Sequence, residues 1–146
     1  PYRRQRQMCI RDRDFVRACA SSFMLSADNA HAVHPNYKEK ADPTNRPYMN
    51  KGIVIKYNAN QKYTTDAISA SIFKEICKKV GVEVQSYVNR SDIPGGSTLG
   101  NISNSHVSLN TVDIGLAQLA MHSPYEIVSK IDTYMAYKAF KVFFTK

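Results

Sequence analysis

Short runs of apolar and β-branched residues alternate along the chain with longer segments of helical periodicity. Residues 23–28, 52–58, 82–88 and 111–115 have the length and side-chain types of buried strands. Residues 34–51 instead hold three prolines among polar residues, which predicts an irregular excursion over the surface. Strands that alternate with crossover helices predict an α/β layered domain with a sheet that is at least partly parallel.

The longest helical pattern between the strands covers residues 65–80. Apolar side chains recur there at every fourth position, so we expect them to form one buried stripe. Gly81 follows directly and marks the end of the helix. A shorter helix is predicted over residues 97–105. The predicted stripe consists of Ile68, Ile72, Ile76 and Val80.

The start of the last helix is predicted from its capping residues. Ser123 occupies the expected N-cap position, Pro124 the first helical position, and Glu126 lies three residues after the cap. This arrangement places the helix directly after His122. Its predicted buried face consists of Ile127, Ile131 and Met135.

Composition limits the class of protein. A chain of 146 residues with 43% hydrophobic content is long enough for one domain with its own core. Its formal charge of +8 raises nucleic acid or an anionic membrane as partners. Residues 1–17 hold six arginines and two aspartates, a net of +4, so only +4 remains for the rest of the chain. We therefore expect neither a nucleic acid nor a membrane as a partner.

The number of cysteines and the length of the apolar runs indicate in which cellular compartment the protein resides. Three cysteines without a CxxC pair argue against a disulfide framework and against a thiolate zinc site. No apolar run reaches the length of a membrane-spanning helix, and the start lacks the apolar core of a secretory signal. These features predict a cytoplasmic protein.

Residues 1–14 differ from the rest of the chain, with scattered arginines and almost no apolar periodicity. Their MCIRDR run resembles a translated adaptor sequence, so we expect a non-native or disordered leader and a domain over residues 15–146. The true reading frame would then extend further upstream. A natural basic arm that binds RNA or a membrane surface is the alternative.

Candidate metal ligands follow the predicted strands. In open α/β sheets, reactive groups gather in the loops beyond the carboxyl ends of the strands. Asp28 and two histidines follow the first strand, and zinc accepts carboxylate oxygen and imidazole nitrogen as ligands. Asp28 could equally cap a turn, with both histidines on the surface. His122 could bind a metal or serve as a core or capping residue.

Two further features could contact a ligand. Lys56 could provide a cation in a pocket, or it could simply face solvent. Gly95 and Gly96 precede the start of a helix, where free backbone N–H groups can meet an anionic or carbonyl oxygen. A tight turn explains the two glycines as well.

Four segments taken together resemble a known family. SADNAHAVHPNY, NKGIVIKYNANQKY, SDIPGGSTLGNI and TVDIGLAQLAMHS resemble segments that occur in the same order, at comparable spacing, in the aspartyl aminopeptidase and aminopeptidase I family. The resemblance covers residues 15–146. It implies the carboxyl-terminal part of an α/β/α sandwich of the zinc peptidase type, with two zinc ions per complete active site. It also implies a homo-oligomer that hydrolyses the N-terminal residue from peptide substrates.

The resemblance extends to individual residues. Asp28 resembles an aspartate that binds one metal of the pair, and His122 resembles the histidine that closes the metal site. His34 is expected to be structural. A positive charge at Lys56 implies a preference for Asp or Glu as the first residue of the peptide. The residues that resemble the substrate contacts of the family are His31, Lys56, Tyr63 and Gly96.

The remaining metal ligands of the family, and its general-base glutamate, precede the aspartate that Asp28 resembles. Before Asp28 this chain has only Asp12 and Asp14 as carboxylates, with no glutamate or histidine. We therefore expect an incomplete, inactive fragment that binds zinc weakly and lacks a catalytic residue of its own. The alternatives are a noncatalytic subunit that pairs with a complete homologue, and a basic nucleic-acid-binding module.

Overall fold

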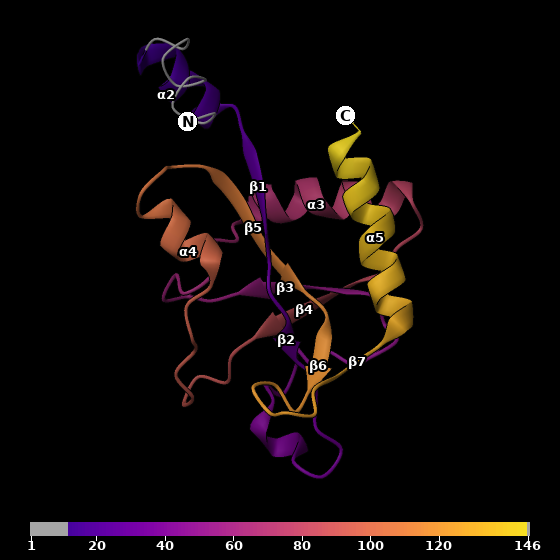
Figure 1. Cartoon of the computed structure of the whole chain (residues 1–146). Helices are drawn as coiled ribbons and strands as arrows, with labels where there is room; N and C mark the ends of the chain where they lie inside the picture. Colours follow the sequence, from indigo (N-terminus) through magenta and orange to yellow (C-terminus); the bar gives the residue numbers. More distant parts are fainter. Residues whose placement is uncertain (1–11, 146) are drawn as a thin grey trace.

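Residues 12–145 are described by the structure, a computed structural model, in which strands and helices alternate (Figure 1). None of the helices in this range is long and apolar enough to cross a membrane. In chain order the elements are α2 (Asp12–Ala20), β1 (Phe23–Ala27), β2 (Ala30–His31), a 3-10 turn (Lys38–Lys40), β3 (Ile53–Tyr57), α3 (Ala67–Lys79), β4 (Val84–Val88), α4 (Leu99–Asn104), β5 (Asn110–Gly115), β6 (Ala117–Leu119), β7 (Ile127–Val128) and α5 (Lys130–Phe144).

The strands form two sheets. The larger has the order β1-β5-β3-β4, in which β1 runs parallel to β5, β3 parallel to β4, and β3 antiparallel to β5. The smaller has the order β2-β6-β7, with β2 parallel to β6 and β7 antiparallel to it. The expectation of an α/β fold with a partly parallel sheet is confirmed, and so are the four predicted strands to within about two residues at each end.

The start of the predicted domain falls inside a helix. Helix α2 runs across residue 15, where we expect the domain to begin. Residues 1–11, most of the predicted leader, lie outside the described part of the chain. The division into residues 1–14 and 15–146 therefore stays a prediction.

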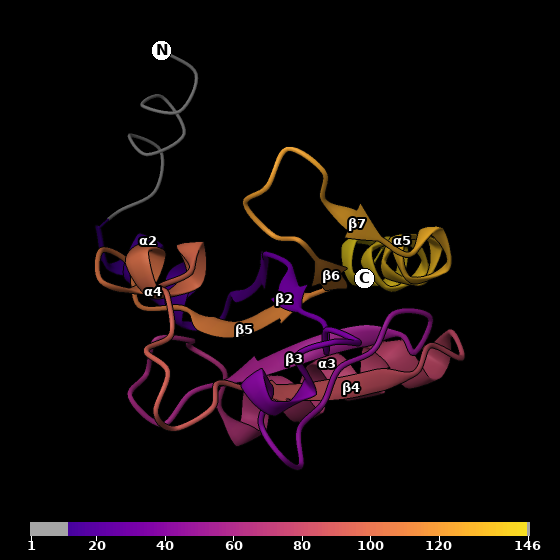
Figure 2. The same ribbon diagram turned by 90° about the horizontal axis from the view of Figure 1, so that it is seen from below.

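The two faces of the larger sheet differ in chemistry. Side chains of a strand alternate between the faces, and in β3 Ile53 and Ile55 pack into the core with Phe73 of α3 and Ala139 of α5. The neighbouring positions, Val54 and Lys56, face the other way. Helix α4 contacts β1 and β5, and it lies on the opposite side of these strands from α5 (Figures 1 and 2). The sheet therefore separates two helical layers, and only one of them covers an apolar face.

The predicted apolar stripe of α3 is wrong in half of its members. Ile68 and Ile72 are 69% and 40% exposed, whereas Ile76 is buried. A helix turns about 100° per residue, so positions four apart drift by about 40° at each step, and a run of four leaves the buried face. Phe73 sets that face instead. The buried residues of α3 are Ser69, Ala70, Phe73, Ile76 and Cys77.

The predicted start of the last helix is also wrong. Helix α5 begins at Lys130, and its N-cap is Ser129, whose hydroxyl accepts hydrogen bonds from two backbone N–H groups of the first turn. The hydroxyl of Ser123 instead accepts a hydrogen bond from the N–H of Tyr125 at 3.0 Å, within a loop. Strand β7 then intervenes, because residues 127–128 pair with β6. Here this polar spacing forms a turn, because the residues that follow it pair as a strand.

The predicted buried face of α5 changes with its start. Ile127 and Ile131 are 45% and 50% exposed, so both are wrongly predicted. Met135 does pack against the main core. The two residues of α5 that are fully buried are Asp132 and Ala139.

Asp132 ties α5 to the segment before β3. Its carboxylate accepts hydrogen bonds from the N–H of Asn50 at 2.7 Å and from the N–H of Gly52 at 3.0 Å. Gly52 has a φ of 90°, and a Cβ there would lie 2.1 Å from the carbonyl oxygen of Glu83, so only glycine fits. A buried carboxylate with two backbone donors thus fixes how the chain enters β3.

We predict that Asp132→Ala lowers the free energy of unfolding by about 3 kcal/mol, because two N–H groups lose their acceptor. Urea denaturation of the purified chain measures this. Glu75→Ala, on the exposed surface of α3, serves as the control and should change stability by less than about 0.5 kcal/mol. Equal effects of the two substitutions would show that the Asp132 contacts do not stabilise the fold.

Candidate functional site

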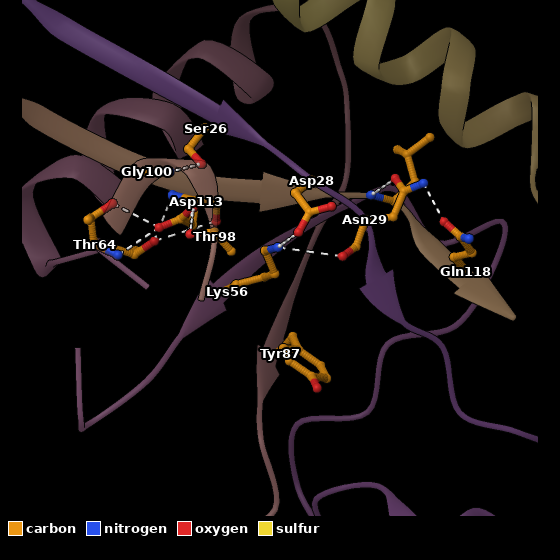
Figure 3. Close-up of polar contacts among 12 residues, drawn as sticks. Ser26, Asp28, Asn29, Lys56, Thr64, Tyr87, Thr98, Gly100, Asp113 and Gln118 are labelled. Carbon is orange, nitrogen blue, oxygen red and sulfur yellow. Dashed lines mark hydrogen bonds and ion pairs between the residues drawn. The ribbon is translucent and has the colours of Figure 1, made fainter. Parts of the chain in front are cut away.

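Polar side chains gather on the face of the larger sheet that lies opposite the main core. Ser26 of β1, Lys56 of β3 and Asp113 of β5 are all buried there, with exposed fractions of 5%, 2% and 0%. Figure 3 shows the three strands bringing these residues together. Buried polar groups on adjacent strands require specific partners, and those partners define the site.

Lys56 is held between two oxygens. Its Nζ lies 3.3 Å from a carboxylate oxygen of Asp28 and 3.5 Å from the carbonyl oxygen of Asn29 (Figure 3). The same Nζ lies 5.0 Å from the ring centroid of Tyr63, within the range of a cation–π contact. Burial lowers the pKa of Lys56, and the charge and hydrogen bond of Asp28 oppose this shift. The interpretation of Lys56 as a solvent-facing lysine is therefore wrong.

Asp28 lies directly beyond β1, and its side chain is 55% exposed. Its N–H donates to the carbonyl oxygen of Ile114 at 2.9 Å, which continues the ladder between β1 and β5. A Cβ on Gly115 would lie 2.0 Å from the carbonyl oxygen of Asp28, so the two backbones approach more closely than any other residue type allows. The sheet thus fixes the backbone position of Asp28. The carboxylate of Asp28 accepts a hydrogen bond from Lys56 and does not cap a turn.

His31 and His122 approach this pair from the smaller sheet. His31 belongs to β2, and partial burial lowers its pKa, as do the nearby positive charges of His122 and Lys56, while Asp28 opposes the shift. His31 therefore lies close enough to His122, Lys56 and Asp28 to interact electrostatically with each of them. His122 lies in the loop between β6 and β7, is exposed, and adopts a φ of 68°.

Local hydrogen bonds hold the segments that carry His122 and His34. The N–H of His122 donates to the carboxylate of Glu126 at 2.6 Å, which holds the loop before β7. His34 lies in the excursion, where its ring contacts the ring of Tyr37 at a centroid distance of 5.1 Å and its Nδ1 accepts from the N–H of Asn36. His34 is exposed, and these contacts are with residues two and three positions further along the chain, so its expected structural role stays a prediction.

Asp113 organises the loops beside Lys56, and sequence reasoning missed it. Its carboxylate accepts hydrogen bonds from the N–H of Thr64 at 2.6 Å, from the hydroxyl of Thr64 at 2.8 Å and from the hydroxyl of Thr98 at 2.7 Å (Figure 3). Thr64 follows Tyr63 in the chain, and Thr98 ends the glycine-containing loop. A carboxylate between Val112 and Ile114, inside a predicted buried strand, was the signal available in the sequence.

The first turn of α4, which follows the glycine-containing loop, is anchored to β1. The N–H of Gly100 donates to the hydroxyl of Ser26 at 3.0 Å (Figure 3). Gly95 packs against the side chain of Asn89, where a Cβ would lie 2.9 Å from the amide oxygen. A Cβ on Gly96 would meet no atom of the described residues within 4 Å. The backbone at Gly96 is therefore accessible to a ligand, whereas a larger residue at position 95 would have to displace the side chain of Asn89.

The described residues do not complete a zinc site. Asp28 and His122 offer the oxygen and nitrogen donors that zinc accepts. Within residues 12–145, however, no group of three or more histidine, cysteine, aspartate or glutamate side chains is arranged to hold a metal ion. Since zinc takes four ligands in structural sites and three protein ligands in catalytic ones, a complete site would need donors beyond these two.

Comparison with known families identifies the class of protein. The family described as "Aminopeptidase I zinc metalloprotease (M18)" matches residues 3–144. The chain belongs to this M18 peptidase family. The predicted resemblance is thereby confirmed, and the members of this family are zinc aminopeptidases.

Individual relatives agree with this assignment. "Probable M18 family aminopeptidase 2" of Clostridium novyi (strain NT) is 54% identical over 131 residues, which are 90% of this chain and 30% of the relative. "Probable aspartyl aminopeptidase" of Ricinus communis is 47% identical over 128 residues, 88% of this chain and 26% of the relative. The chain thus spans about a third or less of the length of these relatives.

Solved structures share the fold. One chain of "Cryo-EM structure of the Ape4 and Nbr1 complex" superimposes with a TM-score of 0.89 at 40% identity, covering 92% of this chain and 26% of that one. A chain of "Structure of S. cerevesiae mApe1 dodecamer" gives a TM-score of 0.80 at 30% identity, covering 90% of this chain and 28% of that one. The predicted fold class, a partial α/β/α domain of the zinc peptidase type, is confirmed.

We predict that Asp113→Asn loosens both loops on the polar face. An amide side chain offers one neutral acceptor oxygen in place of two charged ones, so on one side a threonine donor meets an NH2 group and loses its acceptor, at a cost of about 1–3 kcal/mol. Amide hydrogen exchange at Thr64 and Gly100, measured by NMR, should become about tenfold faster or more. Glu39→Gln, an exposed carboxylate-to-amide change, should leave both rates unchanged. Unaltered exchange in Asp113→Asn would disprove the anchoring role.

Proposed function

We propose that this chain is the carboxyl-terminal part of the catalytic domain of an M18 aminopeptidase that removes an acidic N-terminal residue from peptides at a dinuclear zinc site. Asp28 and His122 supply one ligand each to the metal pair. His31, Tyr63 and Gly96 contact the peptide. Burial raises the pKa of Tyr63 to about 12, so its hydroxyl stays a neutral donor. The general base and the other ligands come from polypeptide outside this sequence.

The buried ammonium of Lys56 is the observation that carries this proposal. A lysine is rarely fully buried, because removal of its charge from water costs several kcal/mol unless partners compensate. Among residues 12–145, Asp28 is the one carboxylate within hydrogen-bond distance of Lys56, and that carboxylate is half-exposed. An acidic side chain of a bound peptide would supply a second negative charge. The preference for Asp or Glu follows from this charge complementarity.

The relatives support an oligomeric enzyme. One structure with the same fold is named as a dodecamer. Because this chain shares that fold, we include the same kind of assembly, a homo-oligomer, in the proposal for the complete protein. The chain spans about 30% of the length of relatives such as the Clostridium protein, which supports an incomplete active site in the 146 residues alone.

We predict that the isolated 146-residue chain retains less than stoichiometric zinc and hydrolyses no aminoacyl substrate, because two ligands rarely hold zinc against water. Inductively coupled plasma mass spectrometry after gel filtration measures the zinc. Release of a fluorophore from aspartyl and leucyl derivatives measures the activity, with a full-length M18 aminopeptidase as the positive control. One zinc ion or more per chain, together with turnover, would contradict the proposal.

In the complete enzyme, Lys56→Met is predicted to lower kcat/KM for an aspartyl substrate by about 30-fold or more, because loss of a buried charge partner costs about 2–5 kcal/mol. The value for a leucyl substrate should change far less. Lys51→Met, at an exposed position before β3, is the matched control and should preserve the ratio of the two rates. An unchanged ratio in Lys56→Met would rule out charge recognition by this lysine.

A further inference from the structure

A cavity of about 300 Å³ opens beside the candidate site, between the excursion of residues 34–51 and the end of β4. His31 lines it on one side and Tyr87 on another. Tyr87 is the register partner of Lys56 in the parallel pair of β3 and β4, and its ring lies 6.3 Å from the ring of Tyr63. Figure 3 shows Tyr87 next to the Lys56 and Asp28 pair. One wall of the cavity is thus formed by the strand next to β3, at the register position of Lys56.

Hydrogen bonds fix the frame of this cavity at both ends. The amide side chain of Gln85 donates to the carbonyl oxygen of Tyr48 at 2.9 Å and accepts from its N–H at 2.8 Å. At the other end, the guanidinium of Arg90 donates to the carbonyl oxygen of Glu39 and forms a two-point ion pair with Asp92 at 2.7 and 2.8 Å. The excursion is therefore tied to β4 on either side of the opening, which keeps the space between them.

The charged side chains at the rim are already engaged. Arg90 pairs with Asp92, and Lys40 lies over the ring of Tyr37 at 5.3 Å. The carboxylate of Asp42 accepts hydrogen bonds from the backbone and side chains of Thr44 and Asn45, and these bonds lower its pKa to about 2. What the cavity offers to a ligand is therefore its apolar wall. That wall includes Ala32, Tyr37, Ala41, Pro47, Tyr87 and Ile93.

We propose that this cavity receives an apolar side chain of the residue that follows the N-terminal residue of the peptide. The inference rests on the proposed function, in which Lys56 contacts the first residue. An extended peptide advances about 3.3–3.6 Å per residue, so the next residue reaches the adjacent strand position, where Tyr87 and His31 border the cavity. A volume of about 300 Å³ is at the lower end for ligand pockets and leaves ample room for one large aliphatic or aromatic side chain.

The test compares Asp-Leu-amide with Asp-Gly-amide as substrates of the complete enzyme. The unmodified enzyme is expected to prefer the leucine peptide by about tenfold or more in kcat/KM, the range that burial of a few methylene groups provides. Ala41→Trp fills the cavity from the loop that borders it, so it should reduce this preference to about twofold or less, chiefly by lowering the value for Asp-Leu-amide. Ala59→Trp, the same substitution in the exposed loop after β3, should retain the full preference.

Ile93→Ser provides a second variant, which makes the wall polar without filling the cavity, and it should lower the preference several-fold. An absence of preference in the unmodified enzyme, or a full preference in both Ala41→Trp and Ile93→Ser, would overturn the inference. If both aspartyl peptides are still cleaved, those results overturn only the inference about the cavity and leave the proposed function standing. If the unmodified enzyme cleaves neither peptide, the proposed function and the cavity inference are both overturned. A change of oligomer size in Ala41→Trp with the preference intact would make the cavity a subunit contact and also overturn the inference.

Discussion

The alternation of side chains along β1, β3 and β5 is the constraint on which the rest of this structure depends. One face of these strands is apolar and packs against α3 and α5, and the other buries a hydroxyl, an ammonium and a carboxylate. A shift of one residue in the register of β3 would place Lys56 in the main core and Ile55 beside Asp113. Packing of the hydrophobic core therefore fixes the strand register, and the register in turn brings Ser26, Lys56 and Asp113 together on the other face.

The polar face joins segments that are far apart in the chain. Asp113 holds Thr64 and Thr98, Ser26 holds Gly100, and Lys56 holds the segment at Asp28. Each of these contacts leads from a strand to a loop that carries a candidate ligand-binding residue. Rigid strands thus position the loops, which is the usual division of labour between scaffold and site.

The strands were predictable because β-branched runs bounded by polar turns leave few other possibilities. The start of α5 was not, because the spacing of Ser123, Pro124 and Glu126 fits a loop as well as a helix, and pairing of β7 with β6 decides between them. The two buried carboxylates were missed for another reason. Asp113 and Asp132 receive their hydrogen bonds from residues 49 and 82 positions away, and no local pattern predicts such partners. Asp28 and Lys56 were candidates from their positions in and after predicted strands, but their local patterns left other roles open. The resemblance in several ordered segments favoured the ligand-binding roles, because it carries long-range information that a single segment lacks.

The place of β1 in the larger sheet has a consequence for the solution behaviour of the chain. Among the described strands, β1 pairs only with β5, so the other side of its backbone forms an open edge. Such an edge is a template for strand addition. Polypeptide that supplied a strand there would enlarge the sheet and shield those amide groups. Without it, the backbone groups along this edge of β1 are available to pair with a second copy of the chain.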